Sequence, residues 1–147
     1  MYDNISIKIE KVVDASFFIE DLFHRSFGQA PPTFPINYVA FCKSDRSTFK
    51  AIGYIHMTEC GEYGLAGGLC VEGDYRHKGL GETLLRNVEK DAGEKKALFV
   101  YTNNPTIASR VGYMPTKLQY LMVKWTKSLS KEEQEKMVNE VGEVGPF

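Results

Sequence analysis

The stretch Leu69–Arg86, with the sequence LCVEGDYRHKGLGETLLR, decides the interpretation of this 147-residue chain. It predicts a strand that ends in a glycine-rich loop, followed by a helix. Gly79 and Gly81 carry no β-carbon, so the backbone can come close to a bulky ligand. The helix that they open presents N–H groups without intrahelical acceptors and a partial positive charge, and both favour a phosphate. Because Arg76 and Lys78 add positive charge just ahead of the glycines, we predict a diphosphate site.

Spacing excludes two better-known phosphate loops. A nucleoside-triphosphate loop has four residues between its glycines and then Lys-Ser/Thr, whereas five residues separate Gly73 from Gly79 and no such pair follows. The dinucleotide fingerprint requires a third glycine where this chain has Leu84. The remaining order is Arg-x-x-Gly-x-Gly beginning at Arg76, preceded five residues earlier by Val71 at a predicted strand end.

This order resembles the signature of the GCN5-related N-acetyltransferase (GNAT) family, in which a valine or similar residue on strand four precedes Arg/Gln-x-x-Gly-x-Gly/Ala. Four residues match that signature: Val71, Arg76, Gly79 and Gly81. A strand, an asparagine segment and a Gly-Tyr pair then follow in the family's order: Ala97–Thr102, Asn103 with Asn104, and Gly112 with Tyr113. The resemblance is closest between Phe49 and Trp125.

The resemblance implies a site for acetyl-coenzyme A (acetyl-CoA). The backbone around Val71 would hold the pantetheine arm, the loop Arg76–Glu82 would hold the pyrophosphate, and an amide at Cys70 or Val71 would donate to the thioester carbonyl. No metal is required, because the thioester already carries an activated acyl group. The implied cofactor-binding residues are Leu69, Cys70, Val71, Arg76, His77, Lys78, Gly79, Leu80, Gly81, Glu82, Thr83 and Asn104.

Two of these residues have an alternative role. Asn104 precedes a proline, so it is either a contact to pantetheine or substrate or an ordinary turn former. Cys70 is either a reactive thiol or a small apolar filler, and the filler is favoured.

The resemblance also implies the architecture. It predicts an α/β fold with a mixed, mostly antiparallel sheet of six to seven strands, which splay apart between strands four and five, and helices on both faces. Residues 1–127 would form the acetyltransferase domain. Residues 128–147 would add a charged helix and tail, either within the same domain or loosely attached.

The residues that transfer protons are not evident. Leu65 stands where many relatives carry a glutamate on strand four, and Ala108 stands where a tyrosine often protonates the departing thiolate. Glu59 and Glu62, in a predicted hairpin turn, are candidate bases, although solvated turn carboxylates are the favoured interpretation. Tyr101 is a candidate acid or water-orienting group, or else an aromatic residue of the core or pocket wall. Water relayed to bulk solvent is a further route for the proton.

Composition limits the partners and the compartment. A chain of this length buries roughly 68–70% of its unfolded surface, which suits one core. The net charge of −1 gives no reason to expect nucleic acid or a membrane surface. Without a signal-peptide pattern or an apolar run of membrane length, and with three cysteines in no paired spacing, we expect a cytoplasmic protein with free thiols. Scattered histidines predict no metal site, and the chain would be a monomer or a homodimer.

Hydrophobic patterns predict an alternation of strands and helices. Strands are expected at residues 5–9, 37–43, 49–58, 63–71, 97–101 and 118–125. A first helix would begin with Asp14 as N-cap and end near Gly28, and its apolar face would comprise Phe17, Phe18, Ile19, Leu22 and Phe23. The helix after the loop would end at Gly93, and a last helix would begin at the capping box of Ser130 and Glu133 and fade after Glu140.

These patterns predict an acetyl-CoA-dependent N-acetyltransferase that acts directly on a primary amine of a small molecule or peptide. The alternative is a non-catalytic acyl-CoA-binding or sensing module of the same fold. The missing glutamate and tyrosine favour that alternative.

Overall fold

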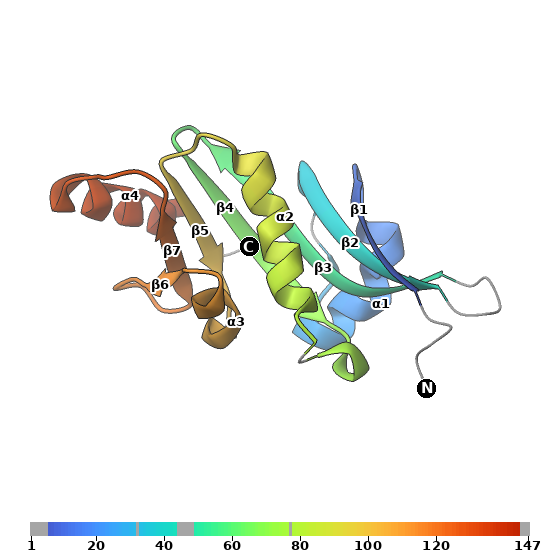
Figure 1. The fold of residues 1–147 in the computed structure, drawn as a ribbon. Helices are drawn as coiled ribbons and strands as arrows, with labels where there is room; N and C mark the ends of the chain where they lie inside the picture. The colour runs from blue at the N-terminus through green and yellow to red at the C-terminus, as the bar shows by residue number, and fades with distance from the viewer. Residues whose placement is uncertain (1–5, 32, 44–48, 77, 145–147) are drawn as a thin grey trace.

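The computed structural model describes residues 6–31, 33–43, 49–76 and 78–144. These residues form one seven-stranded sheet with the spatial order β1-β2-β3-β4-β5-β7-β6 (Figure 1). The strands are β1 Ser6–Val12, β2 Ile36–Lys43, β3 Phe49–Cys60, β4 Tyr63–Val71, β5 Ala97–Tyr101, β6 Met114–Pro115 and β7 Leu121–Trp125. The helices are α1 Ser16–Phe27, α2 Leu80–Ala92, α3 Pro105–Arg110 and α4 Lys131–Val144, with a short 3₁₀ turn at Gly73–Tyr75.

The pairing of the strands confirms the predicted mixed sheet. Strands β1 to β4 form an antiparallel meander, and β5 lies parallel to β4 after the α2 crossover. Strand β7 then pairs antiparallel with β5, and β6 pairs with β7 at the edge. Among the described strands, the one parallel pair, β4 with β5, lies in the interior of the sheet.

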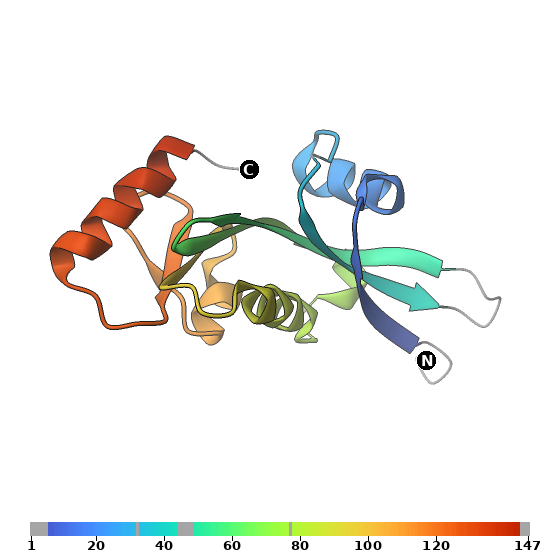
Figure 2. The same cartoon turned by 90° about the horizontal axis from the view of Figure 1, so that it is seen from above.

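Helices cover both faces of the sheet. Seen from above, α1 and α4 lie on one face, and α2 and α3 lie on the other (Figure 2). Helix α2 buries Leu84, Leu85 and Val88 against the middle strands. Helix α4 buries Met137, Val138 and Val141 beside β5 and β7. No helix among the described residues is long and apolar enough to cross a membrane.

Helix α1 departs from its prediction at two points. Phe17 is 85% exposed and Phe18 is 48% exposed, so the expectation that both belong to the buried face is wrong. Because a helix advances about 100° per residue, the face that carries Ile19, Leu22 and Phe23 turns the two preceding aromatic rings toward solvent. The N-cap is Ala15 rather than Asp14, although the Asp14 carboxylate accepts a hydrogen bond from the Ser16 N–H at 3.0 Å.

Other predicted helix ends agree with the structure. Helix α1 ends near Gly28 as predicted, and Gly28 caps it in the left-handed conformation. The capping box of α4 is also present: Ser130 Oγ accepts from the Glu133 N–H, and Glu133 accepts from the Ser130 N–H. The helix continues to Val144, four residues beyond the predicted limit at Glu140. The division of the chain at residue 127 stays a prediction.

The strands β4 and β5 separate part-way along their length. Their parallel register runs from Tyr63 with Ala97 to Ala66 with Val100 and stops there. Residues 67–71 of β4 therefore have no partner in β5, while β3 still pairs on the other side. The predicted splay is present at the C-terminal end of both strands.

A β-bulge lies where this separation begins. Tyr54 of β3 pairs with Cys70 and His56 pairs with Gly67, so β4 contains one extra residue between these pairs. Gly68 has φ of +66°, and a Cβ added there would meet His56 Cδ2 at 2.6 Å. Only glycine fits this position without a shift of the ring. Because bulges increase strand twist and interrupt pairing, this feature turns the end of β4 away from β5.

Candidate functional site

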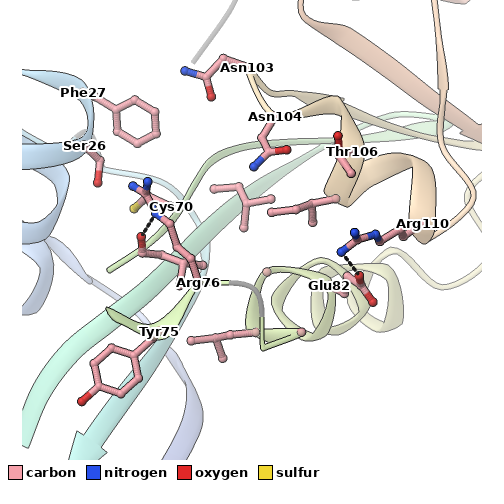
Figure 3. A pocket seen from close by; sticks show the side chains of 16 residues that line it. Ser26, Phe27, Cys70, Tyr75, Arg76, Glu82, Asn103, Asn104, Thr106 and Arg110 are labelled. Carbon is pink, nitrogen blue, oxygen red and sulfur yellow. Dashed lines mark hydrogen bonds and ion pairs between the residues drawn. The ribbon is translucent and has the colours of Figure 1, made fainter. Parts of the chain in front are cut away.

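A cavity of about 500 Å³ lies where β4 and β5 separate (Figure 3). The end of β4, the loop before α2, the first turn of α2, the segment after β5, α3 and the end of α1 all contribute to its wall. The lining residues are Ser26, Phe27, Leu69, Cys70, Val71, Tyr75, Arg76, Gly79, Leu80, Gly81, Glu82, Asn103, Asn104, Thr106, Ile107 and Arg110. A volume of this size suits a small-molecule or cofactor site.

The first turn of α2 presents backbone donors to this cavity. Gly79 is the N-cap in the left-handed conformation, with φ of 81°, and no side chain caps the helix. The helical hydrogen bonds begin with the Thr83 N–H donating to the Gly79 carbonyl at 3.1 Å. The amides of Leu80, Gly81 and Glu82 come before that bond, so no earlier carbonyl within the helix can accept from them. This arrangement is suited to phosphate oxygens.

The backbone of Val71 faces the gap between the strands. The next residue, Glu72, donates its N–H to the Ile52 carbonyl of β3. In a strand, the N–H and C=O of one residue point to the same edge, and those of the next residue point to the opposite edge. Because the N–H of Glu72 points to β3, the N–H and C=O of Val71 point away from β3, to the edge where β5 no longer pairs. Both groups can therefore bind an extended amide-containing chain such as pantetheine.

Arg76 lies in the same gap. Its Nε donates a hydrogen bond to the Val71 carbonyl oxygen at 3.0 Å. In Figure 3 the guanidinium lies near Cys70 and the end of α1, on the opposite side of the cavity from Glu82. Arg110, the second arginine of the lining, instead lies 3.5 Å from the Glu82 carboxylate.

Gly81 packs against Ile107 of α3, a contact that the sequence did not predict. It is buried, and a Cβ added to it would lie 3.1 Å from Ile107 Cδ1 of α3. Its lack of a side chain therefore serves the close packing of α2 on α3. Gly79 would meet nothing within 4 Å, so its positive φ is what requires glycine there.

The other predicted cofactor residues differ in their relation to the cavity. Leu69 and Cys70 line it, and burial raises the pKa of the Cys70 thiol to about 12, which keeps it protonated. Asn104 also lines it, and its N–H donates to Thr102 Oγ1 at 3.0 Å. Thr83 donates its hydroxyl to the Gly79 carbonyl and does not line the cavity.

Two further predicted cofactor residues, His77 and Lys78, belong to the loop before α2. Lys78 places its Nζ 5.9 Å from the centre of the Tyr75 ring, and Tyr75 itself lines the cavity. His77 lies outside the described residues.

The catalytic candidates lie apart from this cavity. Glu59 and Glu62 are at the opposite end of β4, in ion pairs with Lys95 at 3.5 Å and Lys96 at 2.8 Å. At about 3.3 Å per residue, Glu62 is roughly 30 Å along the strand from Val71. The ion pair also lowers the pKa of Glu62, which makes it a weaker proton acceptor. This position argues against a role for either carboxylate at the cavity.

Tyr101 faces the layer of α4. Its hydroxyl donates to the Val141 carbonyl at 3.5 Å, and burial raises its pKa. Leu65 and Ala108, at the positions where relatives place acid–base residues, are both fully buried in apolar clusters. The described residues contain no cluster of His, Cys, Asp or Glu that could hold a metal ion.

Sequence reasoning missed part of the lining. Ser26 and Phe27 come from the end of α1, and Thr106, Ile107 and Arg110 come from α3. The asparagine segment pointed to α3, but no local pattern indicates that α1 ends beside β4, since that contact depends on tertiary packing.

Comparison with known proteins identifies the family. The family described as Acetyltransferase (GNAT) matches residues 12–110, and the chain belongs to it. Among curated protein sequences, none matches the chain significantly.

Solved structures share the fold at low sequence identity. Arabidopsis thaliana NAA60 in complex with a bisubstrate analogue is 14% identical with a TM-score of 0.63, over 83% of this chain and 100% of the other. The NatC complex bound to Gag peptide and CoA is 16% identical with a TM-score of 0.63, over 83% and 99% of the two chains. Escherichia coli YhbS in complex with CoA is 18% identical with a TM-score of 0.53, over 83% and 81%.

Proposed function

We propose that this protein is an acetyl-CoA-dependent N-acetyltransferase that transfers the acetyl group directly to an amine of a small molecule or peptide. One observation carries the proposal: the gap between β4 and β5 and the amides at the start of α2 form the walls of one cavity. A cofactor with a pyrophosphate at one end and an extended arm that ends in a thioester fits such a shape.

The residues of the cavity fit acetyl-CoA in three places. The first-turn amides of α2 suit the pyrophosphate, and Lys78, in the loop just before them but not in the lining, adds positive charge. The Val71 C=O, on the open edge of β4, suits an N–H of the pantetheine arm. Asn103 and Asn104 line the side of the gap that follows β5, where their amide groups can donate or accept.

When bound, the cofactor supplies an acetyl group that is already activated as a thioester. The chain must place an acceptor amine beside it, exclude competing water and stabilise negative charge on the carbonyl oxygen. The Val71 N–H, on the open edge of β4, is the proposed donor for that oxygen, because the Cys70 N–H points toward β3. One such donor contributes on the order of 3 kcal/mol to transition-state stabilisation.

Removal of the amine proton is assigned to water that connects the cavity to solvent. Among the described residues of the lining, the single carboxylate is Glu82, and it is paired with Arg110. An alkylamine is neutral in roughly one molecule in two thousand at pH 7, whereas a peptide α-amine, with a pKa near 8, is neutral in roughly one in ten. We therefore expect α-amines to react faster than alkylamines and kcat/KM to rise with pH up to the pKa of the acceptor.

Two of the structural neighbours make a peptide a reasonable candidate acceptor for this protein. NatC is bound to Gag peptide and CoA, and NAA60 is bound to a bisubstrate analogue. These proteins are only 14–16% identical to this chain, so the choice between a peptide and a small molecule belongs to experiment.

A specific observation favours the alternative of an acyl-CoA-binding module. Leu65 and Ala108 are fully buried, and Tyr101 is bonded to α4, so none of the three offers an acid or base to the cavity.

The two functions are separated by incubating the protein with acetyl-CoA and two panels, one of peptides with free N-termini and one of small amines. Free thiol and acetylated product are measured together. Equal amounts of both support the acetyltransferase. Micromolar CoA binding without thiol release across both panels supports the binding module, and no CoA binding removes both.

A further inference from the structure

The Arg76 side chain is hydrogen-bonded to a backbone carbonyl that the proposed cofactor would also use. Its Nε donates to the Val71 carbonyl oxygen at 3.0 Å, and that carbonyl lies on the open edge of β4. We infer that Arg76 selects among thioesters by competing with the pantetheine arm for Val71, so that a thioester with a pyrophosphate binds well and one without it is disfavoured. This inference rests on the proposed function.

Among the described residues, the Val71 carbonyl has one donor, Arg76, and no partner in β5. The Glu72 N–H donates to the Ile52 carbonyl of β3. Because successive residues of a strand direct their backbone groups to opposite edges, the Val71 C=O points to the gap. The register with β5 ends at Ala66, five residues earlier. A ligand amide that lies along this edge would bond to the oxygen that Arg76 now holds. Although that oxygen can accept a second hydrogen bond, the Arg76 side chain takes up space on the edge along which the ligand would lie.

The orientation of the guanidinium opposes simultaneous contact with Val71 and with a phosphate at α2. Figure 3 shows it near Cys70 and Ser26, across the cavity from the first turn of α2. Arg76 and Cys70 both line the cavity. To reach a phosphate at the start of α2, the side chain must therefore turn away from Cys70 and release Val71.

The charge of Arg76 supplies the driving force for that movement. Among the described residues, no carboxylate forms an ion pair with Arg76, whereas Arg110 on the same lining is paired with Glu82. A phosphate is negatively charged and can accept two parallel N–H···O bonds from a guanidinium, whereas the neutral Val71 carbonyl accepts one bond from Arg76. A pyrophosphate thus offers the guanidinium a better partner than the Val71 carbonyl, and bare pantetheine offers none.

The test compares the dissociation constants of CoA and pantetheine for wild type, Arg76→Ala and Arg76→Gln by calorimetry. Arg76→Ala should weaken CoA binding about ten-fold and tighten pantetheine binding about three- to ten-fold. Arg76→Gln should weaken CoA equally but tighten pantetheine less, since its amide can still donate to the Val71 carbonyl. Arg86→Ala removes the same charge from an exposed position of α2 outside the cavity and should leave both constants unchanged.

Each alternative gives a different result. If Arg76 binds only phosphate, the alanine variant weakens CoA and leaves pantetheine unchanged, which overturns the competition. If Arg76 contacts the acceptor, both constants stay the same while the KM of the acceptor rises, which also overturns it. Failure of wild type to bind CoA would instead contradict the proposed function. Equal thermal unfolding temperatures for the variants establish that the changes are local.

Discussion

Replacing Gly68 with alanine should destabilise this protein more than any ordinary exposed glycine substitution. Gly68 combines a φ of +66° with a neighbour that has no room for a methyl group: the added Cβ would lie 2.6 Å from His56 Cδ2 and 2.7 Å from His56 Nε2. His56 is fully buried and stacks on Phe34 with ring centroids 3.7 Å apart, so the ring cannot simply move aside.

Two contributions give the magnitude. A non-glycine residue in the left-handed region costs about 1–2 kcal/mol. Forcing an extra carbon into a packed core costs about 1–3 kcal/mol more. The free energy of unfolding should therefore fall by about 2–5 kcal/mol, which corresponds to a melting temperature roughly 5–15 °C lower for a chain of this size.

A matched control separates the two contributions. Gly61 has a similar φ of +58°, but a Cβ added there meets nothing within 4 Å. Gly61→Ala should therefore lose about 1–2 kcal/mol, and the difference between the two variants measures the steric term. Urea unfolding at neutral pH gives both values.

A double-mutant cycle tests the partner. His56→Ala removes the ring that the new methyl group would meet, so Gly68→Ala should cost about 1–2 kcal/mol in that background instead of 2–5 kcal/mol. The reasoning is refuted if Gly68→Ala is no more destabilising than Gly61→Ala, or if the cost of Gly68→Ala is the same with and without His56.

Two further predictions follow from the same structure. Gly81→Val should weaken CoA binding about ten-fold by displacing α3, because the new Cβ would lie 3.1 Å from Ile107 Cδ1. In calorimetry, adding Ile107→Ala should restore part of the affinity. If it does not, the valine blocks the ligand itself. Burial lowers the pKa of His56 to about 3, so its neutral form contributes stability fully above pH 6.5 and loses it as the pH falls toward 3, at up to about 1.4 kcal/mol per pH unit. Urea unfolding between pH 7 and pH 4 should show a shallower loss for His56→Phe, and parallel slopes would contradict this.

The sequence predicted the central strands and the glycine-rich turn into α2 well, because their signals are local. The bounds of β4 and β5 agree with the predicted ranges 63–71 and 97–101, since both are apolar runs that end at polar turns. Gly93, the predicted stop of α2, is its C-cap. Strand β6 has only two residues and gives no periodic pattern, so it was missed.

The proton-transfer residues could not be predicted in the same way, because the direction of a side chain depends on sheet register and on the layer above it. Tyr101 ends a strand beside the gap, yet it bonds to Val141 of α4, which only the packing of that helix reveals. The bulge at Gly68 likewise shifts the alternation of side chains in β4, so counting back from Val71 does not give the face of an earlier residue.

Stability and function meet at this bulge. The pairing of β4 with β5 ends at Ala66. The bulge of β4 follows directly, and there Gly68 packs on His56. The ring of His56 therefore supports the conformation that turns Leu69 to Val71 toward the cavity. If the bulge directs the end of β4, relaxation of the strand in Gly68→Ala should weaken pantetheine binding as well as folding, whereas Gly61→Ala should affect folding alone. A Gly68→Ala protein that is destabilised but binds CoA and pantetheine normally would show that the gap is held by α2 and α3 instead.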